Sequence, residues 1–279
     1  MYNGLINVYK EPGFTSMDVI AVLRGILGQK KIGHTGTLDP AAEGVLLVCL
    51  GNATKLCDML ENHDKTYRCT MVLGRTTDTE DTTGTVTGEY PVNVTKESVT
   101  EAIKSFIGDY DQIPPMYSAV KINGRKLYEL ARKGETVERE PRPVVIDRMN
   151  ISKNDDEWKL EATVSGGTYI RTLIHDLGAS LDEYTVMTSL VRTGIETVSL
   201  SAACTLEELE TKPSFVPVET VLDPSIPFVE APDPDAVIHG RKLMLEHDAP
   251  LVLLGQQGRV LAAYAQRDDG FYHCQRGLL

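Results

Sequence analysis

The chain has 279 residues, of which 42% are hydrophobic and 24% are charged, so it is ordinary globular material with enough length for a sizeable core. Residues 1–4 lack the basic flank and apolar core of a signal peptide, and the longest apolar run, residues 45–50, is too short to span a bilayer. We therefore expect a cytoplasmic protein, and its formal charge of -12 argues at first sight against nucleic-acid binding, because phosphate contacts need cations.

The first third of the chain predicts one helix and two strands. Thr15 and Ser16 offer a hydroxyl cap, and Gly28 ends the apolar spacing that follows them. That spacing places one face of an amphipathic helix at Val19, Val22, Leu23, Ile26 and Leu27. Residues 44–50 indicate a buried strand, and residues 65–73 alternate as a strand with one core face.

The middle of the chain is more polar. Residues 76–88 predict a loop rich in Thr, Asp and Gly, and Thr95 caps a predicted helix that ends near Phe106. A proline pair at 114–115 breaks the chain before a short helix at 127–133. Residues 121–150 carry eight Lys or Arg against five Asp or Glu, whereas the rest of the chain is neutral or acidic. From charge alone, a solvated charged loop is favoured there over a phosphate-binding surface.

The last part of the chain predicts a strand at 158–164, a helix from Ile170 to Gly178 and a capping box at Thr205 and Glu208. Six prolines in residues 213–234 indicate a linker, and two short strands follow within 249–264. Strands and helices are interleaved irregularly, without a steady βαβ rhythm. The pattern therefore predicts an α+β fold with a mixed sheet and a small β-rich C-terminal part.

The cysteines and histidines show no metal-binding or disulfide pattern. The five cysteines have no CxxC spacing, which favours reduced core thiols, and the six histidines have no HExxH spacing. We therefore expect no metal site.

Asp39 is the carboxylate whose neighbouring residues indicate a fixed position. It lies in GHTGTLDP, residues 33–40, where two glycines permit unusual backbone angles and Pro40 pushes Asp39 out of helical geometry. By itself this segment is more often a turn. A reactive carboxylate shielded from water would also need a nearby cation. The residues alone leave that choice open among Arg24, Arg68, Arg171 and Arg192, and they favour a core role for Tyr67 over a stacking role.

Several segments occur together in an order that resembles one known family, the TruB family of tRNA pseudouridine synthases. They are GHTGTLDPAAEG at 33–44, GNATK at 51–55, KTYR at 65–68, TDTED at 77–81, QIPPMYSAVK at 112–121, LYELAR at 127–132, GTYIRTLI at 167–174 and LVR at 190–192. The resemblance spans roughly residues 4–222, and the combination is far more specific than any single segment.

The resemblance implies roles for individual residues. Asp39 matches the catalytic aspartate and Tyr67 matches a tyrosine that stacks on the target uracil and takes the C5 proton. Arg171 matches the arginine that pairs with the aspartate. Four further residues are implied in substrate binding, namely His34, Tyr169, Leu190 and Lys10.

It also implies a fold, a substrate and a domain plan. The implied fold is the α+β pseudouridine synthase fold, with a mixed, largely antiparallel sheet flanked by helices. The expected reaction isomerises the T-loop uridine 55 of tRNA after base flipping, with no cofactor, by a monomer that needs no protein partner. Residues 1–222 would form the catalytic domain, with an RNA-clasping insertion at about 121–148, and residues 223–279 a linker and a PUA-like domain. The alternative is a non-catalytic RNA-binding or RNA-folding module on the same scaffold. A hydrolase is disfavoured, because a water-activating metal site is not suggested.

Overall fold

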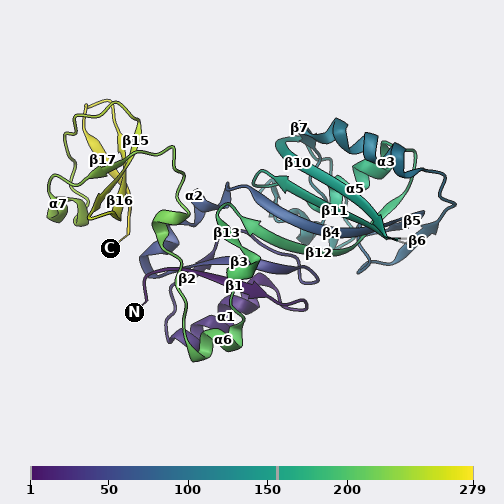
Figure 1. Cartoon of the computed structure of the whole chain (residues 1–279), viewed down its shortest axis with the longest axis horizontal. Helices are drawn as coiled ribbons and strands as arrows, with labels where there is room; N and C mark the ends of the chain where they lie inside the picture. Colours follow the sequence, from purple (N-terminus) through teal and green to yellow (C-terminus); the bar gives the residue numbers. More distant parts are fainter. Residues whose placement is uncertain (1, 155–156, 279) are drawn as a thin grey trace. The chain divides into compact units, whose positions relative to one another are not determined.

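The computed structural model describes residues 2–154 and 157–278, and the chain divides into two compact units (Figure 1). The first unit combines both ends of the sequence, Met1–Glu61 and Ile195–Leu279, and the second unit is the continuous segment Asn62–Gly194. The second unit is thus inserted between two stretches of the first.

The first unit begins with a strand, a helix and two further strands, and it ends with a small sheet. Its elements are β1 (Gly4–Lys10), α1 (Ser16–Leu27), β2 (Ile32–His34), β3 (Glu43–Leu50), η1 (Gly51–Leu56), α2 (Cys57–Glu61), β13 (Val198–Ser199), η3 (Leu200–Ala202), α6 (Leu206–Thr211), η4 (Val218–Thr220), β14 (Phe228–Glu230), α7 (Pro234–Ile238), β15 (Leu251–Gln256), β16 (Arg259–Gln266) and β17 (Tyr272–Gly277).

Helix α1 has both ends that its sequence predicted. The Thr15 hydroxyl accepts from the Asp18 backbone N–H while the Asp18 carboxylate accepts from the Thr15 N–H, and Gly28 closes the helix in the left-handed conformation at φ 60°. The buried face of α1 shares an apolar cluster with strands β1 and β3 and with Leu209 of α6. Helices α1 and α6 lie side by side in Figure 1.

Strand β3 is the centre of the first unit. It pairs antiparallel with β1 from Lys10 and Gly44 to Gly4 and Leu50, and its other edge pairs with the short β2. From Gly44 to Leu50 every residue of β3 is buried, which is the continuous apolar run expected of a strand covered on both faces.

The predicted C-terminal β-rich part is a four-stranded sheet in the order β14-β15-β16-β17. Strand β14 is parallel to β15, and the remaining pairs are antiparallel. This sheet has a core of its own around Tyr264 and Tyr272. Its other residues, including Leu253, Val260 and Leu278, join the apolar cluster of β1 and β3, so the small sheet and the N-terminal strands are packed together.

The second unit is built on a sheet whose strands follow the order β12-β4-β11-β10-β7. Its elements are β4 (Lys65–Leu73), β5 (Arg75–Thr77), β6 (Val86–Glu89), α3 (Lys96–Ala102), η2 (Ile103–Phe106), β7 (Gly108–Gln112), β8 (Lys121–Ile122), β9 (Arg125–Lys126), α4 (Leu127–Ala131), β10 (Arg142–Asn154), β11 (Glu157–Val164), α5 (Ile170–Ala179) and β12 (Thr185–Ile195).

Strands β4 and β11 confirm the alternation predicted for them. Tyr67, Cys69 and Met71 of β4 are buried, whereas the intervening Arg68 is exposed and pairs with Glu161 of β11. The sheet therefore has an apolar face and a polar face.

Helix α5 is fixed to this sheet at three points. The Tyr110 hydroxyl of β7 donates to Asp176, and Gln112 of β7 exchanges two hydrogen bonds with the backbone of Tyr169 at the helix start. On its far side the Thr185 hydroxyl of β12 donates to the Ile174 carbonyl (2.7 Å). The Gln112 bonds fix the start of α5, and the bonds at Asp176 and Ile174 fix its middle.

Two predictions for irregular segments need correction. Residues 76–88 were expected to form a loop, but their two ends pair as the antiparallel hairpin β5–β6, because Thr and Val are well suited to strands. The end of the basic segment was also expected to be irregular, whereas residues from Arg142 onward form β10, whose outward polar residues obscure its alternation. Among the described residues, no helix has the length and apolar character needed to cross a membrane.

Candidate active site

Asp39 lies in a segment that leaves β2 and returns to β3. Gly33 and His34 still pair with β3, and the Thr35 backbone N–H donates to the Leu47 carbonyl (3.1 Å). The Ser16 hydroxyl, at the start of α1, accepts from the Leu38 N–H (2.9 Å), and the Leu38 side chain is 3% exposed. The residue before Asp39 is thus anchored in the core, while Asp39 itself is half-buried.

The Lys10 side chain holds the same segment by hydrogen bonds to main-chain carbonyls. Its ammonium group is fully buried and donates to the carbonyls of Ala42 (2.6 Å), Glu11 (3.0 Å) and Pro40 (3.3 Å). Hydrogen bonds from a charged donor are stronger than neutral ones, and a buried cation needs such partners. Lys10 therefore tightens the turn that carries Asp39.

Two neighbouring side chains complete this part of the site. The His34 ring accepts through Nδ1 from the Gly36 N–H (3.3 Å), which folds the imidazole against its own loop. Beyond the turn, the Tyr9 hydroxyl donates to the Glu43 carboxylate (2.6 Å), and this bond together with burial raises the pKa of Tyr9 to about 12.

Arg171 is the second residue of α5 and its side chain is 6% exposed. One terminal nitrogen donates to the Thr79 carbonyl (3.2 Å), the other donates to the Tyr117 carbonyl (3.0 Å), and Nε lies 3.8 Å from the Asp81 carboxylate. When several nitrogens of a planar guanidinium are each bound by an acceptor, the group has a single orientation. The structure therefore holds a buried cation in a defined direction.

Asp81 is itself oriented by the hairpin loop. Its Oδ1 accepts from the Thr79 hydroxyl (2.8 Å), from the Thr83 N–H (2.9 Å) and from the Thr83 hydroxyl. The loop is attached to β12, because the Met187 N–H donates to Glu80 and the Thr82 N–H donates to Met187. Asp81 is a further functional candidate, and its position in the TDTED segment alone does not indicate its role.

The remaining predicted residues of the second unit are placed by strands and by Gln112. Tyr67 of β4 is 7% exposed and Leu190 of β12 is 8% exposed. Tyr169 is half-buried, and its backbone is held by the buried Gln112 amide (2.7 and 3.0 Å). Gln112 was also missed as a supporting residue, although the segment 112–121 contained it.

The other arginines considered from sequence have different surroundings. Arg24 is exposed and donates to the Lys30 carbonyl (3.1 Å), and Arg68 is exposed beside Glu161 (3.6 Å). Arg192 is 1% exposed. Burial thus separates Arg171 and Arg192 from the two surface arginines.

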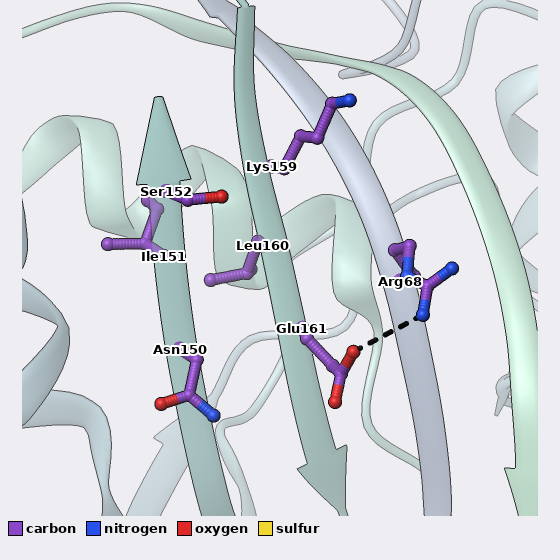
Figure 2. Close-up of a pocket in the computed structure, with 7 residues that line it drawn as sticks. All are labelled: Arg68, Asn150, Ile151, Ser152, Lys159, Leu160 and Glu161. Atoms are coloured by element: carbon purple, nitrogen blue, oxygen red, sulfur yellow. Dashed lines mark ion pairs between the residues drawn. The ribbon is translucent and has the colours of Figure 1, made fainter. Parts of the chain in front are cut away.

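A shallow pocket of about 350 Å³ lies elsewhere, on the polar face of strands β4, β10 and β11 (Figure 2). Figure 2 shows Arg68 and Glu161 paired at its edge, with Asn150, Ser152 and Lys159 nearby. Tyr67 and Arg68 are consecutive in β4, so their side chains point to opposite faces of the sheet. This pocket is therefore separate from the face that carries Tyr67. Among residues 2–154 and 157–278, no group of three or more His, Cys, Asp or Glu is arranged to hold a metal ion.

Residues 24–170 match the family described as TruB family pseudouridylate synthase (N terminal domain). A tRNA pseudouridine synthase B of Lachnoclostridium phytofermentans is 51% identical over 80% of this chain and 75% of the relative. A tRNA pseudouridine synthase B of Oenococcus oeni is 41% identical over 100% of this chain and 99% of its own length.

Solved structures give the same picture for the fold. A Cbf5–Nop10–Gar1 complex has a chain with 25% identity and a TM-score of 0.71, covering 94% of this chain and 78% of that one. A chain of an H/ACA ribonucleoprotein bound to a substrate RNA has a TM-score of 0.73 at 22% identity, covering 99% and 85%. These likenesses confirm the predicted α+β fold.

Proposed function

The chain belongs to the TruB family and is therefore an isomerase that makes pseudouridine in tRNA, and we propose that its target is the T-loop uridine conventionally numbered 55. The match extends over the whole length of a relative named as a tRNA pseudouridine synthase B. A tRNA substrate also implies work in the cytoplasm, and we expect a monomer that needs no protein partner.

Asp39 is the proposed nucleophile. Pseudouridine formation breaks the bond between N1 and C1′ of uridine, turns the base, and joins C5 to C1′. Both the glycal route and the direct-addition route require one carboxylate in a fixed position. The observation that carries the assignment is the support given to the Asp39 segment, from Lys10 below and from Ser16 at Leu38. A carboxylate whose backbone is already fixed in this way needs little rearrangement during the reaction.

Arg171 is the proposed partner of that carboxylate. A cation beside an aspartate keeps it ionised where water is excluded, since burial alone would favour the protonated form. The guanidinium is already oriented by Thr79, Tyr117 and Asp81. We infer that Asp81 keeps the Arg171 guanidinium in this orientation and partly neutralises its positive charge until the substrate is bound.

Tyr67 is proposed to stack on the uracil and to take the proton from C5. The target base must leave the RNA stack to reach a buried site, and an aromatic ring stabilises a flipped base. His34, Tyr169 and Leu190 are proposed to shape the binding site, and Lys10 contributes through the Asp39 segment that it supports.

The RNA-facing surfaces follow the proposed domain plan. Residues 1–222 form the catalytic domain in this proposal, with the basic segment at about 121–148 as an RNA clasp. Within it, Lys126 and Arg132 lie over the Tyr128 ring, each 5.4 Å from its centre. Residues 223–279 are proposed as a small PUA-like domain.

The test is a tRNA modification assay with two matched variants. Wild-type protein is incubated with unmodified tRNA, and pseudouridine is mapped in the T arm by chemical labelling and primer extension. We expect Asp39→Asn to abolish the product, by more than about 1000-fold, with tRNA affinity unchanged within a few-fold. Asp268→Asn, at an exposed turn of the small sheet, should behave as wild type.

Two results would contradict the proposal. Full activity of Asp39→Asn would remove this residue from the chemistry. Binding of tRNA by the wild-type protein without any modified uridine would favour the non-catalytic RNA-binding or RNA-folding module instead.

A further inference from the structure

Cys49 and Cys57 lie close together beside Gly33, near the start of the segment that carries Asp39. Cys49 is in the middle of the first unit, in β3, directly opposite Gly33 of β2. Cys57 is the first residue of α2, and η1 brings it back over the same strand. A Cβ placed on Gly33 would lie only 3.3 Å from the Cys57 sulfur. The Cys57 thiol therefore packs closely against Gly33, at a place where a side chain on residue 33 would crowd it.

The two thiols differ in exposure. Cys49 is completely buried, whereas Cys57 is partly exposed and packs against the same apolar cluster. A small oxidant that diffuses from solvent therefore meets Cys57 first, with Cys49 directly behind it.

The two thiols also differ in acidity, in the same sense. A hydrogen bond from Cys49 lowers the pKa of Cys57, against the opposing effects of burial and of Asp58 and Glu61. The pKa of Cys49 is raised, first by this bond and then by burial. Thiolates react with peroxides and thiols do not, so acidity and exposure agree on which sulfur reacts first.

We propose that Cys57 and Cys49 form a peroxide-reactive dithiol, in which Cys57 is oxidised first and Cys49 closes a reversible disulfide. The Cys57 thiolate attacks one oxygen of hydrogen peroxide, the O–O bond breaks, and the hydroxide leaving group becomes water by taking up a proton. The Cys49 sulfur then attacks the Cys57 sulfenic acid, forms the S–S bond and displaces a second water. In total, two thiols and one peroxide become a disulfide and two waters.

Closure of the disulfide would reach the Asp39 segment. The sulfurs must move from hydrogen-bond contact to a bond length of about 2.05 Å, so the first turn of α2 has to shift towards β3. Gly33 lies under this turn, and the next residue, His34, leads into the segment that carries Asp39. We therefore expect the oxidised protein to lose isomerase activity at least five-fold, and this half of the inference rests on the proposed function.

The experiment treats the full-length reduced protein with increasing hydrogen peroxide and reads thiols and activity in parallel. Trypsin cleaves after Lys55, between the two cysteines, so a disulfide joins residues 32–55 to residues 56–65 as one linked pair of peptides. We expect this pair to appear with a mass two hydrogens lower than the sum of the separate peptides. Activity should fall as it appears, and dithiothreitol should restore both.

Three variants separate the roles. Cys49→Ser should stop at a sulfenic acid on Cys57 that dimedone traps, and Cys57→Ser should be left unmodified at Cys49. Cys69→Ser is the matched control, because Cys69 is 2% exposed and burial raises its pKa to about 12. This variant should keep both the linked peptides and the loss of activity.

Several outcomes would overturn the inference. Both thiols surviving peroxide, first oxidation at Cys49, or a disulfide from Cys57 to Cys274 would refute the dithiol. A complete Cys49–Cys57 disulfide with full activity would refute its effect on the reaction. If the reduced wild-type protein forms no pseudouridine, the proposed function fails, yet the peptide masses still decide the thiol chemistry.

Discussion

The Asp39 segment of the first unit and the Arg171 site of the second are held in different ways. Asp39 lies on a turn that is held through its main chain, because the Lys10 ammonium donates to the Ala42 carbonyl and the Ser16 hydroxyl accepts from the Leu38 N–H. Arg171 is held at its own side chain, by two carbonyls and by Asp81. The first arrangement fixes a backbone and the second fixes a charge. Damage to the first should therefore lower stability, whereas damage to the second should lower the rate.

The largest effect expected from this contrast is at Arg171. Arg171→Lys keeps the positive charge but loses the planar fork that reaches Thr79 and Tyr117, so we expect kcat to fall at least about 100-fold. Steady-state kinetics on unmodified tRNA measures it. Arg68→Lys is the control, since Arg68 is exposed and pairs only loosely with Glu161 (3.6 Å). Equal rates for the two variants would show that charge alone is enough.

A smaller effect is expected at Asp81. Asp81→Asn preserves volume and can still accept from Thr83, but it removes the carboxylate from Arg171. We expect kcat to fall about 10-fold with little change in KM, as for a positioning residue. The control is Asp78→Asn on the same loop, because Asp78 accepts from the Thr85 N–H (2.8 Å) and not from Arg171. A rise in KM with unchanged kcat would assign Asp81 to binding instead.

At Lys10 the loss should appear first in stability. Lys10→Met removes the charged donor from the carbonyls of Ala42, Glu11 and Pro40, of which the bond to Ala42 is buried, and this loss costs about 2 kcal/mol. Thermal unfolding should show Tm lower by several degrees, with a proportionally smaller fall in kcat than at Arg171. Lys30→Met, at an exposed position of the same unit, should leave Tm unchanged. A stable Lys10→Met protein that is inactive would mean that Lys10 acts on the substrate.

The smallest effect is expected at Tyr9 and depends on pH. Glu43 raises the pKa of Tyr9 from 10.0 to about 12, so the folded state holds this proton more tightly than the unfolded state. The resulting stabilisation is complete below pH 10 and is lost as the pH rises towards 12. Tyr9→Phe should therefore lower Tm at pH 8 and approach the wild type near pH 12. Tyr2→Phe serves as control, and a pH-independent difference would contradict the bond to Glu43.

What could be predicted from the sequence was mostly local. Helix α1 was predicted with both of its ends, because the hydroxyl cap at Thr15 and the stop at Gly28 lie directly beside the helix in the sequence. The alternation of β4 was equally clear, since one face of the strand is buried. The motif residues of the candidate site were found through their resemblance to a family rather than through local chemistry.

What could not be predicted depends on contacts between distant residues. Asp81 and Arg171 are paired although β7, β10 and β11 lie between them in the chain. The three carbonyls that accept from Lys10 come from two separate segments. Charge patterns along the sequence do not indicate such partners, because a buried lysine and a surface lysine look alike until the fold is known.

The shared core of the first unit also has a consequence for synthesis on the ribosome. Leu278 and Val260 belong to the same apolar cluster as Leu5 and Val45, so the N-terminal strands cannot complete their packing until the residues near Leu278 have emerged from the exit tunnel. The second unit is continuous in sequence and can fold much earlier. Strand β3, which follows the Asp39 segment, therefore completes the packing of this face only after almost all of the remaining chain has been made.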